Sequence, residues 1–330
     1  MDGVSVVIPC LNEEKYISSC LDSLINNGFN HEKLEILVVD GGSTDTTLSI
    51  VLTYQKSLPF IKLVHNINRK TPFALNLGVK NALFNKVLIA GAHANYPKNY
   101  IKELYTHLNS NNIDIIGGAI ETKAKNQNEK AKAICFVLSH RFGVGNSIFR
   151  IGADELLQVD TVPFGLYNKE IFDKVGYYNE ELIRNHDMEL SSRIKAGGYN
   201  IWMDPKLKCT YYARETFNGL AKNNYGNGLW NIKTLFITKK FSSLGLRHYI
   251  PMLFIMSLLL PVLIGVLWNS YVSLFSLLSL LLYISLIVMV GLKAKNQNSM
   301  YVIWAFACLH FSYGWGSCVG IFSLKKRVAA

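Results

Sequence analysis

The C-terminal third of this 330-residue chain contains no aspartate and no glutamate. Glu215 is the last acidic residue, whereas ten lysines and arginines follow it. The preceding residues hold the other 24 bases against all 23 acids, so the formal charge of +11 belongs almost entirely to the C-terminal third. Because the N-terminal part is close to neutral, the charge does not indicate a nucleic-acid-binding protein.

Paired cysteine motifs and internal repeats are also missing. The six cysteines show no CxxC pair and no zinc-ligand spacing, which predicts reduced, mostly buried thiols in a cytoplasmic domain. The first apolar stretch, residues 4–9, is only as long as a strand. We therefore expect no secretory signal peptide.

Two long uncharged runs occupy the acid-free third. Residues 250–268 and 271–292 contain no charge over 19 and 22 residues, and only Asn269-Ser270 separate them. About 20 apolar residues are enough for a helix to cross the hydrocarbon core of a bilayer, so we expect a membrane hairpin. Two buried helices of a soluble core are the alternative. The flanking bases fit a cytoplasmic surface that faces anionic lipid.

A third apolar run, residues 300–322, contains more polar residues and is followed by Lys325-Lys326-Arg327. If this run crossed the membrane, the three bases would lie on the far side, against the positive-inside rule. We therefore expect an interfacial or re-entrant helix. Residues 216–249, which are basic and amphipathic, are expected to form a linker on the membrane surface.

Near the start of the chain, two short apolar strands end abruptly in acidic turns. Residues 4–9 lead into Asn12-Glu13-Glu14, and residues 34–39 lead into Asp40-Gly41-Gly42. Continuous apolar runs of this length are typical of parallel strands covered on both faces, and ligands bind at the carboxyl ends of such strands. With further strands at 61–64 and 86–90 and helices between them, the pattern predicts a doubly wound α/β domain with a nucleotide pocket.

After residue 111 the pattern becomes mixed and gives weaker predictions. The expected elements are strands at 113–117, 159–162 and 199–203, a flexible loop at 143–152, and helices at 169–175 and 185–196.

Several segments together resemble family 2 of the inverting glycosyltransferases. They are VSVVIPCLNEE, VVDGGSTDTT, the run Ala74-Leu75-Asn76-Leu77-Gly78, and VDTVPFGLYNKEIFDKVGYYNEELIRNHDMELSSRIKAGGYNIW. The resemblance covers about residues 3–235 and is nearest to the branch that extends bacterial exopolysaccharides, including succinoglycan. It implies an enzyme of the hexosyltransferase type (EC 2.4). The implied organisation is a GT-A domain over 1–215, the linker over 216–249 and a membrane domain over 250–330.

The resemblance also implies roles for individual residues. Asp40 would accept hydrogen bonds from the base or ribose of a nucleotide-sugar, in a pocket lined by Pro9, Glu13 and Arg69. For Asp40 the alternative is a turn-forming carboxylate with an Asx bond. Asp187 matches the family's catalytic acid and would act as the general base. Its alternative role is to interact with the dipole of its own helix.

The metal motif of the family is incomplete in this chain. Relatives place Asp-x-Asp or Asp-x-His after the fourth strand to hold Mg²⁺ or Mn²⁺, but the triplet here is Gly91-Ala92-His93. Gly91 has no side chain, and the His93 imidazole is softer than the oxygens that these ions prefer. Three interpretations remain: a weakened metal site completed by diphosphate oxygens, a site that has lost function, and a histidine that only donates hydrogen bonds.

Arg214 and Trp230 match the region that faces the acceptor and the diphosphate. Processive relatives carry Gln-x-x-Arg-Trp there, and only the Trp is clearly present, so we expect a single sugar transfer. The alternative for Trp230 is an interfacial anchor.

Taken together, these features predict an enzyme at the inner membrane of a bacterial cell, with its catalytic domain in the cytoplasm. It would move one sugar from a nucleotide donor, expected to be UDP-linked, to a polyprenyl-diphosphate-linked saccharide, together with other polysaccharide-assembly proteins. One alternative is a polyprenyl-phosphate sugar synthase. The other is a catalytically impaired partner of a polysaccharide complex, suggested by Gly91.

Overall fold

A computed structural model describes residues 1–110, 112–126, 128–241 and 244–323. The chain forms two compact units. The first contains residues 1–121 and 148–212, and the second contains residues 122–147 and 213–330. Segment 122–147, which the expected boundaries place in the N-terminal domain, therefore groups with the C-terminal helices.

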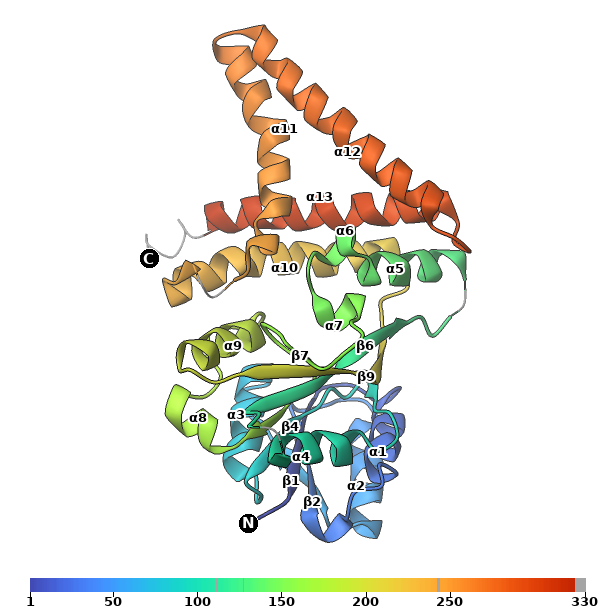
Figure 1. The fold of residues 1–330 in the computed structure, drawn as a ribbon, viewed down its shortest axis with the longest axis vertical. Helices are drawn as coiled ribbons and strands as arrows, with labels where there is room; N and C mark the ends of the chain where they lie inside the picture. Colours follow the sequence, from blue (N-terminus) through green and yellow to red (C-terminus); the bar gives the residue numbers. More distant parts are fainter. Residues whose placement is uncertain (111, 127, 242–243, 324–330) are drawn as a thin grey trace. The chain divides into compact units, whose positions relative to one another are not determined.

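The first unit begins with four parallel strands connected by helices (Figure 1). The elements in chain order are β1 (Val4–Cys10), α1 (Ile17–Ile25), β2 (Leu34–Asp40), α2 (Thr47–Ser57), β3 (Ile61–His65), α3 (Thr71–Asn81) and β4 (Lys86–Ile89). Strand β1 lies between β2 and β4, and Cys10 pairs with Asp40, so the two acidic turns meet at one edge of the sheet. The predicted α/β organisation of this half is confirmed.

The central strands are buried on both faces, as their continuous apolar sequences require. On β1, Val4, Val6 and Ile8 pack into one apolar cluster, while Val7 packs into a second cluster on the other face. The register of the sheet is consequently fixed by two cores at once.

The sheet continues with shorter, antiparallel strands. These are β8 (Leu166–Asn168), β6 (Ile115–Lys123), β9 (Ile201–Tyr212), β5 (Ala94–Asn95) and β7 (Leu157–Gln158), and the sheet order is β3-β2-β1-β4-β8-β6-β9-β5 with β7 paired to β9. The helices of this half are α4 (Tyr100–Ser110), α7 (Ile148–Ile151), α8 (Glu170–Val175) and α9 (His186–Ala196).

This antiparallel half corrects several sequence-based expectations. Strands β6 and β9 are longer than the runs expected at 113–117 and 199–203, and residues 159–162 form no strand. The segment expected as a loop at 143–152 contains the second half of α6 (Arg141–Val144) and all of α7. Strand β9 contains alternating polar residues and a proline, so its full length is not visible in the sequence. Its pairing depends on strands that are distant in the sequence.

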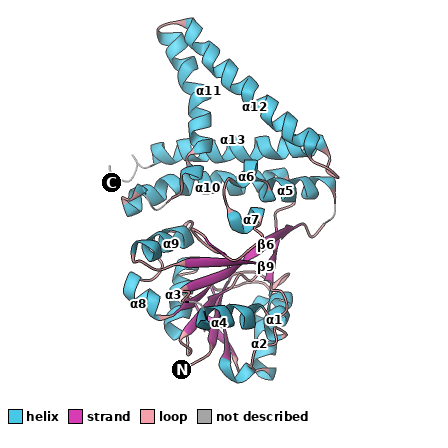
Figure 2. Ribbon diagram, viewed as in Figure 1, coloured by secondary structure: helices cyan, strands magenta, loops and turns pink. Residues whose placement is uncertain are grey.

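The second unit is helical (Figure 2). Its long helices are α5 (Glu129–Ser139), α10 (Phe217–Thr238), α11 (Ile250–Leu267), α12 (Ser273–Lys293) and α13 (Ser299–Ser323). Three segments are long and apolar enough to cross a membrane: Leu246–Leu267, Ser270–Lys293 and Ser299–Ser323. The first two present mostly exposed apolar side chains, as expected for a hairpin in lipid, whereas half of the third is buried.

Helices α10 and α13 lie side by side (Figure 1). Glycines allow this close approach, because a Cβ at Gly228 would lie 1.9 Å from the carbonyl oxygen of Tyr313, and one at Gly316 would lie 2.1 Å from that of Tyr225. Small residues at such contacts are typical of helix pairs in membranes. Much of the expected basic linker is thus a packed helix; residues 242–243 and the basic triplet Lys325-Lys326-Arg327 lie outside the described residues.

Candidate active site

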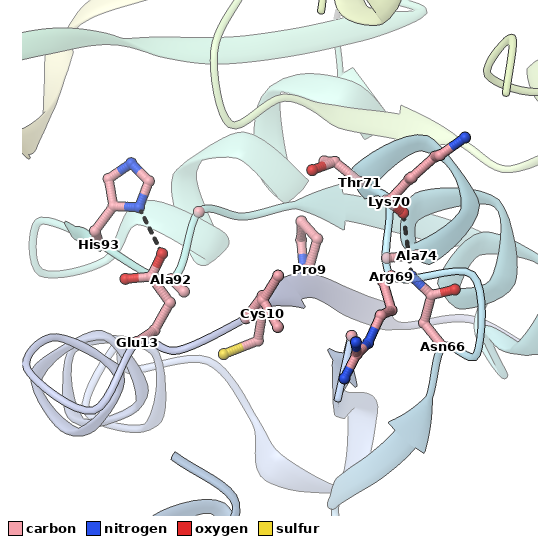
Figure 3. Close-up of a pocket in the computed structure, with 13 residues that line it drawn as sticks. Pro9, Cys10, Glu13, Asn66, Arg69, Lys70, Thr71, Ala74, Ala92 and His93 are labelled. Carbon is pink, nitrogen blue, oxygen red and sulfur yellow. Dashed lines mark hydrogen bonds and ion pairs between the residues drawn. The ribbon is translucent and has the colours of Figure 1, made fainter. Parts of the chain in front are cut away.

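A pocket of about 210 Å³ opens where β1, β2 and β4 end (Figure 3). It is lined by Pro9, Cys10, Leu11, Glu13, Gly41, Asn66, Arg69, Lys70, Thr71, Ala74, Gly91, Ala92 and His93. Glu13 and His93 lie on one side of Pro9 and Cys10, and Arg69 lies on the other. The structure therefore brings together four residues predicted from sequence: Pro9, Glu13, Arg69 and His93.

The two acidic turns hold each other in place. The Asn12 side chain accepts a hydrogen bond of 2.8 Å from the Thr44 amide, and the Asn12 amide donates to Ser43 Oγ at 2.9 Å. Glu14 Oε2 accepts from the amide and the hydroxyl of Thr46 at 3.1 and 2.9 Å. The polar side chains that identified this region in the sequence, such as Asn12 and Glu14, consequently hold the two turns together.

Asp40 is 1% exposed and is surrounded by donors of its own loop. Its carboxylate accepts from the Gly42 amide at 2.7 Å, from the Ser43 amide at 3.0 Å and from the Ser43 hydroxyl at 2.5 Å. These contacts are those of the turn-forming alternative. At this turn the neighbouring Gly41, rather than the Asp40 side chain, lines the pocket.

Arg69 and Lys70 form the cationic side of the pocket, directly before α3. Asn66 shapes this loop, since its amide donates to the Asp40 carbonyl at 2.7 Å and its side chain donates to the Lys70 carbonyl at 3.1 Å. Two cations beside a helix N-terminus provide a favourable place for phosphate groups.

Cys10 also lines the pocket, but it is not a nucleophile. Burial, followed by the charges of Glu13 and Asp40, raises the pKa of its thiol to about 12. The thiol consequently remains protonated near neutral pH.

Glu13 and His93 face each other across 3.3 Å, from Oε1 to Nδ1. The described residues contain no group of three or more histidines, cysteines or acids that would hold a metal ion. This imidazole–carboxylate pair fits only an ion that brings most of its own oxygen ligands. At Gly91, an added Cβ would lie 2.8 Å from Cε1 of Phe164, so an aromatic ring occupies the place of the missing carboxylate.

Asp187 is exposed in the first turn of α9. No hydrogen bond to its carboxylate comes from any residue that the structure describes, although its backbone carbonyl accepts from Ser191 at 2.8 Å. Its predicted position at a helix start is thus observed, and its carboxylate remains available to a substrate hydroxyl.

Arg193 fixes the helix that carries Asp187. Its guanidinium donates to Glu189 at 2.7 and 2.9 Å and to the backbone carbonyls of Val175, Gly176 and Tyr177 at 2.6 to 2.8 Å. Three of these five charge-assisted bonds attach α9 to the end of α8 and the two residues that follow it, while the two to Glu189 lie within α9.

Asn76, in one of the segments that carry the family resemblance, attaches the same region to α3. Its side chain donates to the Tyr178 carbonyl and to Glu180, both at 2.9 Å, and accepts from the Tyr178 amide at 2.9 Å. This motif residue consequently positions the segment around Tyr178 and Glu180, which precedes α9, and does not line the pocket.

Arg150 and Tyr211 were not anticipated from the sequence. The Arg150 guanidinium lies 5.4 Å from the Tyr211 ring centroid, and the Tyr211 ring lies 5.5 Å from that of His93. A four-residue helix and a residue at the end of a long strand leave no local pattern that would have identified them. His186, to which no role was assigned, has a buried Nδ1 without a partner in the described part of the chain.

Arg214 and Trp230 belong to the second unit. Arg214 is exposed, and Lys233 Nζ lies 4.9 Å from the Trp230 ring centroid. All residues that line the pocket, and Asp187 itself, belong to the first unit.

Comparisons with known proteins agree with this geometry. The family model described as Glycosyl transferase family 2 matches residues 5–176, slightly more than half of the chain. A Methanococcus voltae protein is 29% identical over 326 residues, covering 95% of this chain and 96% of its own length. It is named dolichyl N-acetyl-alpha-D-glucosaminyl phosphate 3-beta-D-2,3-diacetamido-2,3-dideoxy-beta-D-glucuronosyltransferase. The succinoglycan biosynthesis protein ExoA of Rhizobium meliloti (strain 1021) is 29% identical over 249 residues, covering 75% of this chain and 74% of its own.

Solved structures show the same fold at low sequence identity. The crystal structure of S. aureus TarS 1–349 matches with a TM-score of 0.54 and 18% identity, covering 96% of this chain and 90% of that one. The mannosyltransferase PcManGT from Pyrobaculum calidifontis, in complex with GDP-Man and Mn²⁺, matches with a TM-score of 0.58 and 15% identity, covering 97% and 87%.

Proposed function

The chain belongs to glycosyl transferase family 2, and from that premise we propose that it moves one sugar from a UDP-sugar to a lipid-linked saccharide with inversion at the anomeric carbon. It is a glycosyltransferase with a GT-A fold and three candidate membrane spans. The observation that carries the proposal is the Asp187 carboxylate, which has no hydrogen-bond partner among the described residues and lies in the same compact unit as a strand-end pocket with two cations.

The chemistry follows from the charges of the site. An acceptor hydroxyl attacks the anomeric carbon, its oxygen forms the new glycosidic bond, and Asp187 takes the proton. The bond from that carbon to the phosphate oxygen breaks, and its electron pair leaves with the nucleoside diphosphate. Arg69 and Lys70 stabilise the charge that develops on the departing diphosphate.

Asp40 shapes the nucleotide end of the pocket. Its carboxylate fixes Gly41 and Gly42 in a turn, so that backbone groups of the loop and the neighbouring Glu13 are presented to the base and ribose.

A divalent ion, Mg²⁺ or Mn²⁺, would enter with the donor diphosphate. His93 and Glu13 are the residues that would hold it, and the ion would supply positive charge to the leaving group. The Mn²⁺ and GDP-Man in the PcManGT structure support this assignment for the fold. Titration of UDP with and without Mn²⁺, for the parent and a His93→Ala variant, measures the coupling directly as a change in affinity.

The proposed acceptor is a saccharide on a polyprenyl phosphate or diphosphate at the cytoplasmic face of the inner membrane. The acid-free, basic C-terminal third favours an anionic lipid, and Arg214 and Trp230 belong to that part of the chain. The M. voltae relative is named for a dolichyl-phosphate-linked sugar, which supports a lipid-linked acceptor. The R. meliloti relative is named for succinoglycan biosynthesis, which supports a role in surface polysaccharide synthesis, for which we also propose other assembly proteins as partners.

Product analysis with purified full-length protein tests this function. A panel of radiolabelled nucleotide-sugars is offered to polyprenyl-diphosphate-linked saccharides and, separately, to polyprenyl phosphate alone. We expect a disaccharide extension in the first arm and about 10²–10⁴-fold slower transfer by Asp187→Asn, because a general base contributes that much. Asp154→Asn, an exposed acid of the same unit, is the matched control and should retain full activity.

The outcomes separate the alternatives. Transfer only to polyprenyl phosphate would identify a polyprenyl-phosphate sugar synthase. No transfer by the parent protein to any acceptor, with activity gained in a variant that restores an acid at position 91, would identify an impaired partner subunit and overturn the proposal.

A further inference from the structure

Arg150 is a half-buried arginine whose positive charge the steps above do not use. Its guanidinium centre lies 5.4 Å from the centroid of the Tyr211 ring and 5.5 Å from that of Phe149. Its Nη1 is buried and has no hydrogen-bond partner in the part of the chain that the structure describes. A buried N–H donor without an acceptor is costly, so this nitrogen is expected to have an anionic acceptor in the working state.

The chemistry of the side chain indicates which anion fits. Aromatic rings contact the guanidinium but offer no strong hydrogen-bond acceptor, whereas its N–H groups form a rigid fork that matches carboxylate and phosphate oxygens. Asp187 is the nearby acid, since its negative charge raises the pKa of Arg150, which burial lowers. The two do not form an ion pair among the described residues, so the fork is available to a ligand.

The position of Arg150 connects the two parts of the site. Tyr211 contacts Arg150 on one side and the ring of His93, which lines the pocket, at 5.5 Å on the other. Ala94, next to His93 in sequence, pairs with Tyr211 in the β5–β9 ladder, so the sheet itself holds this arrangement. Arg150 is consequently linked to the pocket through Tyr211 and His93, and Asp187 is the acid that acts on its charge.

We propose that Arg150 binds a phosphate oxygen of the reacting substrates, an inference that rests on the proposed function. The phosphate is either that of the departing nucleoside diphosphate or that of the lipid acceptor. In the first case the guanidinium supplies positive charge at a site where Gly91 has removed a metal-binding carboxylate.

Nucleotide binding distinguishes the first source. Full-length protein in detergent is titrated with UDP, GDP, CDP and dTDP, and the tightest ligand is used for Arg150→Met, Arg150→Lys and the control Arg141→Met, an exposed arginine on α6. If Arg150 binds the donor diphosphate, we expect at least a tenfold loss of affinity in Arg150→Met and a smaller loss in Arg150→Lys. Affinity for the corresponding nucleoside and the behaviour of the control should not change.

Acceptor kinetics distinguish the second source. If Arg150 binds the lipid phosphate, nucleotide affinity is retained, but the KM for a polyprenyl-phosphate-linked saccharide rises about tenfold in Arg150→Met. The KM for the same saccharide on a neutral octyl chain should stay within twofold, because that acceptor offers no phosphate.

A structural role gives a different pattern. If Arg150 only packs against Tyr211, Arg150→Met lowers the Tm while nucleotide affinity and both KM values stay within twofold, which overturns the proposal. If Arg150→Met does not fold, the same affinity and KM measurements on Arg150→Lys test the proposal, because lysine keeps the positive charge but lacks the forked N–H groups of the guanidinium. A parent protein that neither binds a nucleoside diphosphate nor transfers sugar refutes the proposed function as well, whereas an active parent with unaffected variants refutes the Arg150 subsite alone.

Discussion

The parallel and antiparallel halves of the first unit use their charged groups in opposite ways. In the parallel half, Asp40 and Glu14 are occupied by hydrogen bonds within and between the acidic turns. In the antiparallel half, the Asp187 carboxylate and the Arg150 Nη1 have no hydrogen-bond partner among the described residues. The parallel half therefore holds its acidic turns in place, while the antiparallel half leaves one acid and one guanidinium nitrogen without a hydrogen-bond partner among the residues that the structure describes.

The strongest test of this contrast is Arg193→Met, which removes the fastening of α9 and leaves Glu189 buried without its partner. We expect a loss of about 3 kcal/mol in the free energy of unfolding, because breaking a largely buried, hydrogen-bonded pair is costly. Transfer activity should fall together with stability, since Asp187 loses its support. The measurement is urea unfolding alongside transfer kinetics.

Arg193→Lys is the informative companion, because it keeps the charge but cannot make five bonds. If both variants unfold at the urea concentration of the parent protein, the Arg193 contacts do not hold α9 in place. That result would contradict the role proposed for Arg193.

A second test introduces a carboxylate where the family motif expects one. Gly91→Asp alone should lose about 2 kcal/mol of stability, since its Cβ would lie 2.8 Å from the Phe164 ring. Adding Phe164→Leu should recover part of this loss. Only the double variant should then show nucleotide binding that Mn²⁺ strengthens beyond its effect on the parent, which isothermal titration measures.

If Gly91→Asp is as stable as the parent, the ring is free to move aside and the motif has lost its acid without any compensating packing. That result would remove one structural reason for the glycine.

The smallest effect distinguishes the two aspartates directly. Asp40→Asn should cost about 1–2 kcal/mol, because a buried carboxylate with three donors loses charge-assisted bonds. Asp187→Asn should change stability by less than about 1 kcal/mol, since only a helix-dipole interaction is lost. Thermal unfolding of the two variants measures these losses. Equal losses would contradict the conclusion that Asp40 stabilises the fold whereas Asp187 does not.

The sequence predicted the parallel half well because each of its signals is local. An apolar strand followed by a polar turn, as at Val39-Asp40, is visible within a few residues, and it identified the pocket. It left open whether the Asp40 carboxylate would face a nucleotide or its own loop, because the loop conformation depends on the positive φ of 83° at Gly42. The family resemblance gave the helix-start position of Asp187 for the same local reason.

The antiparallel half was predicted poorly because its contacts join distant segments. The environment of Arg150 depends on Tyr211, 61 positions further along, and on a helix only four residues long. A short hydrophobic run such as residues 148–151 gives no period from which a helix can be identified. The lack of a partner for Arg150 Nη1 among the described residues is consequently a property of the fold that only a three-dimensional structure reveals.

The glycine contact between α10 and α13 has a consequence for the order of biosynthesis. Residues 239–298, which include the apolar hairpin, emerge from the ribosome between the two helices. Until α13 follows them, the face of α10 that buries Asn224, Gly228 and Asn231 has no covering helix. The helical unit therefore closes only after the apolar hairpin has been synthesised, when α13 packs against α10.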